Sequence, residues 1–282
     1  MLRALMRAAA HLPLRVLHAA GALLGWLLYA TSRRYRRHLR ENLERAGYRD
    51  ARTRRAAIAE AGKMLTELPA LWFRPHHEVA ALVRAVEGEA QMLTEHARGM
   101  PVLFLAPHLG CFEVTSLYAS TLMPITVLYR PPRIAALRPL LREGRERANV
   151  RLAAADLGGV RDLIAALRRG EAVGILPDQA PSVGEGEWAP FFGVPAYTMT
   201  LAARLAARAG ALCYVVYARR LRRGAGYVIA LRPYPAARAG ERATERLNRA
   251  LEEAIRECPE QYLWGYNRYK RPRGAPAPEQ AA

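Results

Sequence analysis

Residues 101–114 have the sequence PVLFLAPHLGCFEV, and the fold that we expect follows from the pattern of this segment. Its first part, VLFLA, is a short continuous apolar run that is typical of a buried strand. Pro107 and Gly110 mark a sharp exit from the strand, and Glu113 lies near the start of the helix that is expected to follow. The stretch therefore predicts a strand, a turn and a helix, with His108 at the carboxyl end of the strand.

Short apolar runs alternate with helix-like stretches along the rest of the chain. The runs are ITVLY, AVGIL, LCYVVYA and YVIAL, and the helix-like stretches are 134–148, 159–169, 196–209 and 241–257. Strands that alternate with helices predict an α/β domain with a mostly parallel sheet flanked by helices and with catalytic groups at strand ends. Residues 40–98 are expected to be helical, because apolar residues recur there at helical spacing.

The N-terminal segment contains an apolar run, VLHAAGALLGWLLYA, between two groups of arginines. A full membrane span needs about 20 apolar residues, and a dense arginine cluster stands where a signal peptide would have its cleavage site. We expect residues 1–40 to form a membrane-anchor helix with basic flanks, either a single span or a helix lying in the interface. Residues 41–270 would form the α/β domain, and residues 271–282, rich in Pro and Ala, a disordered tail.

The charge balance points to anionic partners. The chain has 43 Lys and Arg residues against 25 Asp and Glu, a net charge of +18. Nucleic acid, an acidic protein and an anionic lipid surface are all compatible with that charge. The three cysteines are far apart and do not have the spacing of metal ligands, so we expect no metal site.

His108 and Glu113 are the candidate catalytic pair. Across the turn between them, the carboxylate can accept a hydrogen bond from one imidazole nitrogen and leave the other nitrogen as a base. Since the pair includes no protein nucleophile, a substrate hydroxyl is the candidate, deprotonated by His108 as it attacks an activated acyl carbonyl. A backbone N–H in the Gly110 turn can stabilise the oxyanion.

Two further strand ends bring candidate residues to the same edge of the sheet. The strand ITVLY is followed by Arg130 and Arg133, either of which can bind a phosphate or the developing oxyanion. The strand AVGIL is followed by Asp178 and Gln179. We expect Asp178 to be an orienting acid and not a metal ligand, because no partner carboxylate is near it in the sequence.

Two other motifs leave alternatives open. Phe191 and Phe192 in PFFGVPAYT either pack in the core or line a groove for an acyl chain. Near the C-terminus, Arg268 lies among alternating aromatic and cationic residues in WGYNRYKR. Such a segment can bind nucleic acid, a membrane interface or an acidic carrier.

Taken in order, these motifs resemble one known family. The His-x-x-x-x-Glu turn, LYRPP, GILPDQ, PFFGVPA and a terminal W-x-x-N-R-Y-K-R-P are similar to the late lipid A acyltransferases. These are lauroyl and myristoyl transferases of Gram-negative bacteria, within the lysophospholipid acyltransferase superfamily. The resemblance covers nearly the whole chain, and it implies a glycerolipid acyltransferase-like α/β fold.

The resemblance also implies an activity. It implies an enzyme on the cytoplasmic face of the bacterial inner membrane that moves an acyl chain from acyl carrier protein to a hydroxyl of a phosphorylated, Kdo-bearing lipid A precursor. His108 and Glu113 would be its catalytic pair, Arg130 its essential arginine and Asp178 the acid of its third motif. The thioester donor is a substrate, so no cofactor is implied, and anionic inner-membrane lipids would be further partners. The chain departs from the family at Asn267–Lys270, which leaves acceptor and chain length open.

Other functions remain as alternatives at this stage. The same residues would serve acylation of a lysophospholipid or another glycolipid, and coenzyme A is an alternative donor. A basic nucleic-acid-binding protein would need neither His108 nor Glu113 and would leave the apolar N-terminus unexplained, so no nucleic acid is expected. An inactive lipid-binding scaffold would not need an intact His-Glu pair.

Overall fold

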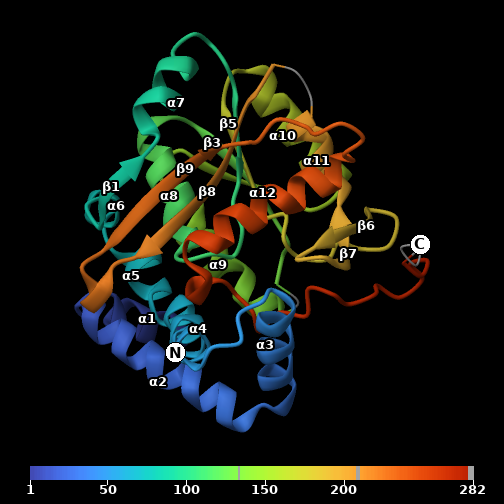
Figure 1. Cartoon of the computed structure of the whole chain (residues 1–282). Helices are drawn as coiled ribbons and strands as arrows, with labels where there is room; N and C mark the ends of the chain where they lie inside the picture. The colour runs from blue at the N-terminus through green and yellow to red at the C-terminus, as the bar shows by residue number, and fades with distance from the viewer. Residues whose placement is uncertain (133, 208–209, 279–282) are drawn as a thin grey trace.

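The computed structural model describes residues 1–132, 134–207 and 210–278. A seven-stranded sheet crosses the molecule in the order β1-β9-β8-β2-β5-β3-β4 (Figure 1). Its strands are β1 Val83–Glu87, β2 Val102–Leu105, β3 Ile125–Tyr129, β4 Val150–Ala154, β5 Ala172–Ile175, β8 Leu212–Arg220 and β9 Tyr227–Pro233. All neighbouring pairs are parallel except the β8–β9 hairpin. The expected α/β fold with a mostly parallel sheet is confirmed.

Helices cover both faces of the sheet. The helices are α1 Leu2–Ala10, α2 Leu14–Thr31, α3 Arg33–Arg45, α4 Ala51–Thr66, α5 Leu68–Phe73, α6 His76–Ala80, α7 Glu89–His96, α8 Phe112–Leu122, α9 Arg138–Arg145, α10 Leu157–Arg168, α11 Thr200–Ala207 and α12 Ala243–Glu257. Strand β2 explains why the central strands read as continuous apolar runs. Leu103 and Leu105 face one core and Val102 and Phe104 face the other, so every residue of the strand is buried.

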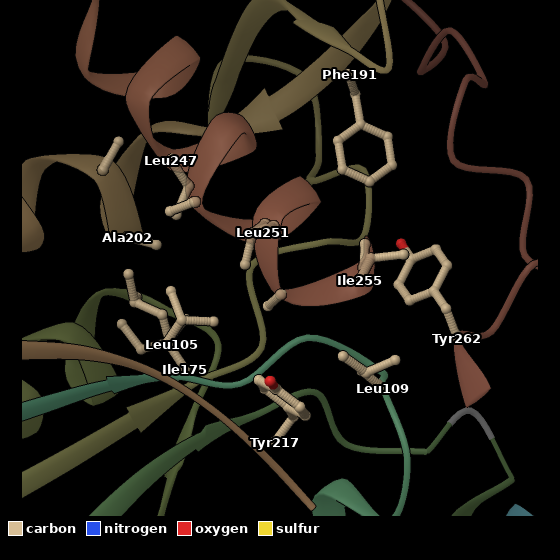
Figure 2. Close-up of a cluster of buried hydrophobic side chains, with 14 of the residues drawn as sticks. Leu105, Leu109, Ile175, Phe191, Ala202, Tyr217, Leu247, Leu251, Ile255 and Tyr262 are labelled. Carbon is tan, nitrogen blue, oxygen red and sulfur yellow. The ribbon is translucent and has the colours of Figure 1, made fainter. Parts of the chain in front are cut away.

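The two cores lie on opposite faces of the sheet. One is built mainly between the sheet and α10, α11 and α12, and Figure 2 shows Leu247, Leu251 and Ile255 of α12 beside Leu105 and Ile175 of the sheet. The other lies between the sheet and α5, α6, α7 and α8. The helix that follows His108 therefore belongs to the second core.

Two expectations about secondary structure are wrong. The helix expected over 196–209 begins at Thr200, because residues 194–199 form β7 (Val194–Met199), which pairs antiparallel with β6 (Gly186–Phe191). Phe192 and Gly193 join these strands with φ values of 49° and 73°, a two-residue turn whose twist matches a hairpin. The helical region 40–98 also contains a strand, β1, because Val83–Glu87 pairs with β9 at the sheet edge.

The N-terminal helices pack against the domain. α1, α2 and α3 gather at one end of the molecule, at the bottom of Figure 1. α3 runs through the expected boundary at residue 40, and its Asn42 donates hydrogen bonds of 2.7 Å to the carbonyls of Trp264 and Tyr266. The described part of the C-terminal segment, 271–278, contacts the β6–β7 hairpin, where the Trp188 indole donates to the carbonyl of Pro276 at 2.9 Å.

Candidate functional site

Three neighbouring strands end at the site. β2, β5 and β3 are adjacent and parallel, and their carboxyl ends lead to His108, to Asp178 and Gln179, and to Arg130. Side chains that follow neighbouring parallel strands meet at one edge of a sheet. This topology joins residues about 70 positions apart, since the His108–Asp178 hydrogen bonds span a sequence separation of 70.

Asp178 holds His108 through two contacts. Its Oδ1 lies 2.8 Å from Nδ1 of the imidazole, and its Oδ2 accepts a hydrogen bond of 2.9 Å from the backbone N–H of His108. Burial would raise the pKa of Asp178, but the charge and hydrogen bonds of His108 hold that pKa below its usual range. The Asp178 carboxylate is therefore placed to accept a hydrogen bond from Nδ1–H, an arrangement that favours the tautomer whose Nε2 is an acceptor.

Gln179 lies against the other side of the ring. Its side-chain Nε2 is 3.2 Å from Nε2 of His108, so the amide N–H donates to the nitrogen that Asp178 leaves unprotonated. Gln179 is half-buried, whereas the Asp178 carboxylate beside it is buried. Two consecutive residues thus fix one imidazole from both ends.

Glu113 does not occupy the place that the sequence suggested for it. The expected hydrogen bond from the imidazole to Glu113 is replaced by the one to Asp178, and Glu113 instead binds the guanidinium of Arg145, with Nε–oxygen distances of 3.0 and 3.1 Å. The indole of Trp72 also donates to Glu113, at 3.3 Å. The reason is geometric: from the first turn of α8, this side chain meets α5 and α9 and not the turn that carries His108.

The buried Glu113 carboxylate and the half-buried Arg145 guanidinium both lie against Trp72. Burial would lower the pKa of Arg145, but the adjacent Glu113 carboxylate raises it above its ordinary value. The guanidinium carbon of Arg145 also lies 6.0 Å from the centre of the Trp72 ring, within the range of a cation–π contact. Sequence reasoning missed Trp72 and Arg145, because no local pattern links them to Glu113 over 41 and 32 positions.

An apolar cavity of about 320 Å³ lies between α8 and the sheet. Its lining includes the polar residues His108, Gln179, Arg130, Glu113 and Arg145, together with apolar side chains from the second core such as Met92, Phe104, Ile125, Val127 and Leu231. Arg130 is exposed and Met92 is buried, so the cavity runs from the surface into the interior. An apolar space that opens beside a histidine suits a hydrocarbon chain with a reactive end.

The Gly110 turn is structural. Its N–H donates to the carbonyl of Gln261 at 3.0 Å, and the next N–H, of Cys111, donates to the carbonyl of Ala218 at 2.8 Å. Gly110 has a φ of 61°, and a Cβ there would lie 1.9 Å from the Ala218 oxygen. Because these N–H groups are engaged, the expected oxyanion donor at Gly110 is not free in this conformation. Burial also raises the pKa of the Cys111 thiol, which opposes a nucleophilic role.

The remaining predicted residues lie elsewhere. Phe191 is buried in the α12 core and Phe192 packs against it, and the lining of the cavity includes neither. The buried guanidinium of Arg268 donates to the carbonyl of Tyr197 at 2.8 Å and to the hydroxyl of Thr198 at 2.9 Å, so it holds the β7 strand. Arg133 lies outside the described residues.

Behind the turn that carries His108 lies a buried polar network that the sequence did not reveal. Arg220 donates to the carbonyl of Gly110 at 2.8 Å and to both oxygens of Glu67, at 2.6 and 2.9 Å. His18 of α2 lies 3.2 Å from the same carboxylate. Burial would raise the pKa of Glu67, but Arg220 and His18 lower it to about 2.

Comparison with known proteins gives this geometry a context. The sequence model of the family described as "Bacterial lipid A biosynthesis acyltransferase" matches residues 1–271. The chain is 28% identical over 269 residues to the lipid A biosynthesis palmitoleoyltransferase of Escherichia coli (strain K12), covering 92% of this chain and 86% of that protein. It is 26% identical over 276 residues to the lipid A biosynthesis lauroyltransferase of the same organism, covering 94% and 89%.

Proposed function

Because the chain belongs to the bacterial lipid A biosynthesis acyltransferase family, we propose which substrates this acyltransferase uses and how its site acts on them. The donor is an acyl thioester of acyl carrier protein, and the acceptor is a hydroxyl of a Kdo-bearing lipid A precursor. The enzyme works at the cytoplasmic face of the bacterial inner membrane. The observation that carries the proposal is the His108–Asp178 pair at the wall of an apolar cavity.

In the proposed mechanism His108 is the general base. Its Nε2 takes the proton of the acceptor hydroxyl as the hydroxyl oxygen attacks the thioester carbonyl. The tetrahedral intermediate then collapses, the carbon–sulfur bond breaks, and the imidazolium returns the proton to the thiolate that leaves. Asp178 keeps Nδ1 protonated and stabilises the positive ring between the two steps.

Gln179 and Arg130 assist the reaction in different ways. The Gln179 amide beside Nε2 must move from the base when the hydroxyl arrives, and it is then placed to donate to the oxyanion in the role first given to the Gly110 turn. Arg130 is exposed at the cavity entrance, where it can bind a phosphate of the acceptor. The net charge of +18 favours the acidic carrier and the anionic lipids.

The cavity receives the acyl chain. Its apolar lining by α7, α8 and the sheet is the wall of the chain site, and the pair formed by Glu113 and Arg145 is the polar part of that wall. In this proposal Asp178 takes the orienting role first assigned to Glu113. Glu113 acts through Arg145, by holding the guanidinium at the cavity.

Steady-state kinetics of the purified wild type and three variants test this assignment. His108→Ala and Asp178→Asn should each lower turnover by ~100- to 10,000-fold with little change in the Michaelis constants. Glu113→Gln should mainly raise the Michaelis constant for the donor, because it loosens Arg145 at the chain site. If Glu113→Gln instead lowers turnover at saturating substrates as much as Asp178→Asn does, the assignment of the orienting acid is wrong.

A further inference from the structure

Helix α2 is long and apolar enough to cross a membrane by length and composition, the one such helix in the described part of the chain. One of its faces, however, is packed along α4 with backbone in contact with backbone. A Cβ on Gly62 would lie 1.9 Å from the carbonyl oxygen of Gly21, and a Cβ on Gly25 would lie 2.0 Å from the carbonyl oxygen of Ile58. This face of α2 therefore belongs to the interior of the domain, and no lipid can surround the helix.

Both ends of α2 are held by the same domain. At its start, Thr66 donates to the carbonyl of Leu17 at 2.7 Å, and His18 contacts Glu67 in the buried network. After its end, α3 turns back at once, and Asn42 is bonded to the carbonyls of Trp264 and Tyr266. A membrane-spanning helix would place its two ends on opposite sides of the bilayer, which these contacts do not permit.

The partner helix is also unsuited to the hydrocarbon region. α4 runs beside α2 and carries Arg52, Arg54, Arg55 and Lys63. Because Gly25 lies against Ile58, the next turn of α2 lies toward the arginines of α4. Charged residues within the hydrocarbon region are unfavourable, so α2 cannot cross the bilayer without drawing these arginines toward it.

The opposite face of α1 and α2 is apolar and exposed. Of the 13 large hydrophobic residues exposed among the described residues, 8 lie in the first 27 positions: Met1, Leu2, Leu5, Leu12, Val16, Leu23, Trp26 and Leu27. Exposed arginines flank them, namely Arg3, Arg7, Arg15, Arg33, Arg34 and Arg37. A clustered apolar surface rimmed by cations matches the acyl and phosphate layers of an anionic bilayer.

We propose that α1 and α2 lie in the plane of an anionic bilayer surface, embedded by this apolar face, with both ends of α2 on the same side. This inference rests on the membrane acyltransferase function proposed above and resolves the choice between a span and an interfacial helix. The buried network that begins at His18 then connects the embedded helix to the carbonyl of Gly110, two residues after His108. The catalytic turn is thereby held at a fixed place relative to the lipid surface.

Labelling of the full-length protein in sealed native membranes tests the topology. Cysteines are introduced singly, as His11→Cys before α2 and as Thr31→Cys at its end, both exposed positions. A membrane-impermeant maleimide is applied to right-side-out and inside-out vesicles, with wild type as the background from the native cysteines. Reaction of both variants in the same vesicle orientation is expected. Reaction of one variant in each orientation would overturn the proposal.

Vesicle binding tests the embedded face without reference to catalysis. The test variant is Leu23→Glu, because Leu23 lies on α2 and is 73% exposed. The matched control is Leu157→Glu, because Leu157 lies on α10 and is 79% exposed. Binding to phosphatidylethanolamine–phosphatidylglycerol vesicles at high salt should weaken roughly tenfold or more for Leu23→Glu only. Equal binding by both variants would overturn the proposal. Activity on detergent-dispersed acceptor should be unchanged in both variants. A failure of the proposed function would appear in this activity and not in vesicle binding, so the two failures can be distinguished.

Discussion

At the scale of single residues, the site separates two carboxylates that the sequence placed around one histidine. Asp178 is bonded to the imidazole and to the backbone of His108, while Glu113 is bonded to Arg145 and Trp72. One acid therefore orients the imidazole, and the other positions a cation in the cavity wall. This division follows from which helices and strands surround each side chain and not from spacing along the chain.

Arg130 lies at the entrance of the cavity. Steady-state kinetics can distinguish a role in binding the acceptor phosphate from a role in stabilising the oxyanion. An exposed guanidinium there can clamp a phosphate of the acceptor, so Arg130→Ala should raise the Michaelis constant for a phosphorylated acceptor by roughly tenfold or more. Arg130→Lys keeps the charge but loses the two-pronged geometry, and should lie between wild type and Ala. Turnover at saturation should change little. An equal loss of turnover on acceptors with and without phosphate would instead assign Arg130 to the oxyanion.

At the scale of the elements, the buried network ties the turn after His108 to strand β8 and to the segment between α4 and α5. Arg220 on β8 reaches the Gly110 carbonyl, and Glu67 between α4 and α5 neutralises Arg220. The side chains of Arg220 and Glu67 are each 1% exposed. Removal of one member would leave a buried charge without its partner, which is strongly destabilising.

The pH dependence of stability should reveal this ion pair. The pKa of Glu67 falls from 4.5 to about 2 on folding, so its contribution is fully present above pH 4.5 and is lost as pH falls toward 2. Glu67→Gln should lower the free energy of unfolding by about 3 kcal/mol at neutral pH, and the difference from wild type should shrink below pH 4.5. Denaturant unfolding of both proteins at several pH values measures this difference in the free energy of unfolding. A difference independent of pH over this range would show that the pair is not charged in the folded state.

The helices and strands differ in how well they could be predicted from the sequence. The central strands could be predicted because burial on both faces makes them continuous apolar runs, as in β2. The edge strands β1 and β4 and the β6–β7 hairpin have mixed exposure, so no such run marks them. Asp178 could be expected near His108 because both follow sheet strands. The contacts of Arg145 and Arg220 could not be predicted from the sequence, because only tertiary packing brings together residues so far apart.

At the scale of the whole molecule, the two proposals together relate the cavity, the turn that carries His108 and the N-terminal helices. In the proposed function, the cavity between α8 and the sheet would receive the acyl chain, and the polar residues at the strand ends would meet the acceptor. α1 to α3 gather at one end of the molecule, where the clustered apolar face and its arginines can hold the enzyme on lipid (Figure 1). An acceptor that stays in the bilayer would thus be met by an enzyme that stays at its surface.

Substrate choice by the protein tests the proposed acyl transfer to a lipid A precursor. Purified enzyme in anionic vesicles is given a Kdo-bearing lipid A precursor and a lysophospholipid together, with acyl chains on acyl carrier protein or on coenzyme A. Mass spectrometry then follows the acylated products, with His108→Ala as the blank. We expect the lipid A precursor to gain one acyl chain from acyl carrier protein, at a rate at least ~100-fold above the blank. Acylation of the lysophospholipid alone, or an equal rate with His108→Ala, would contradict it.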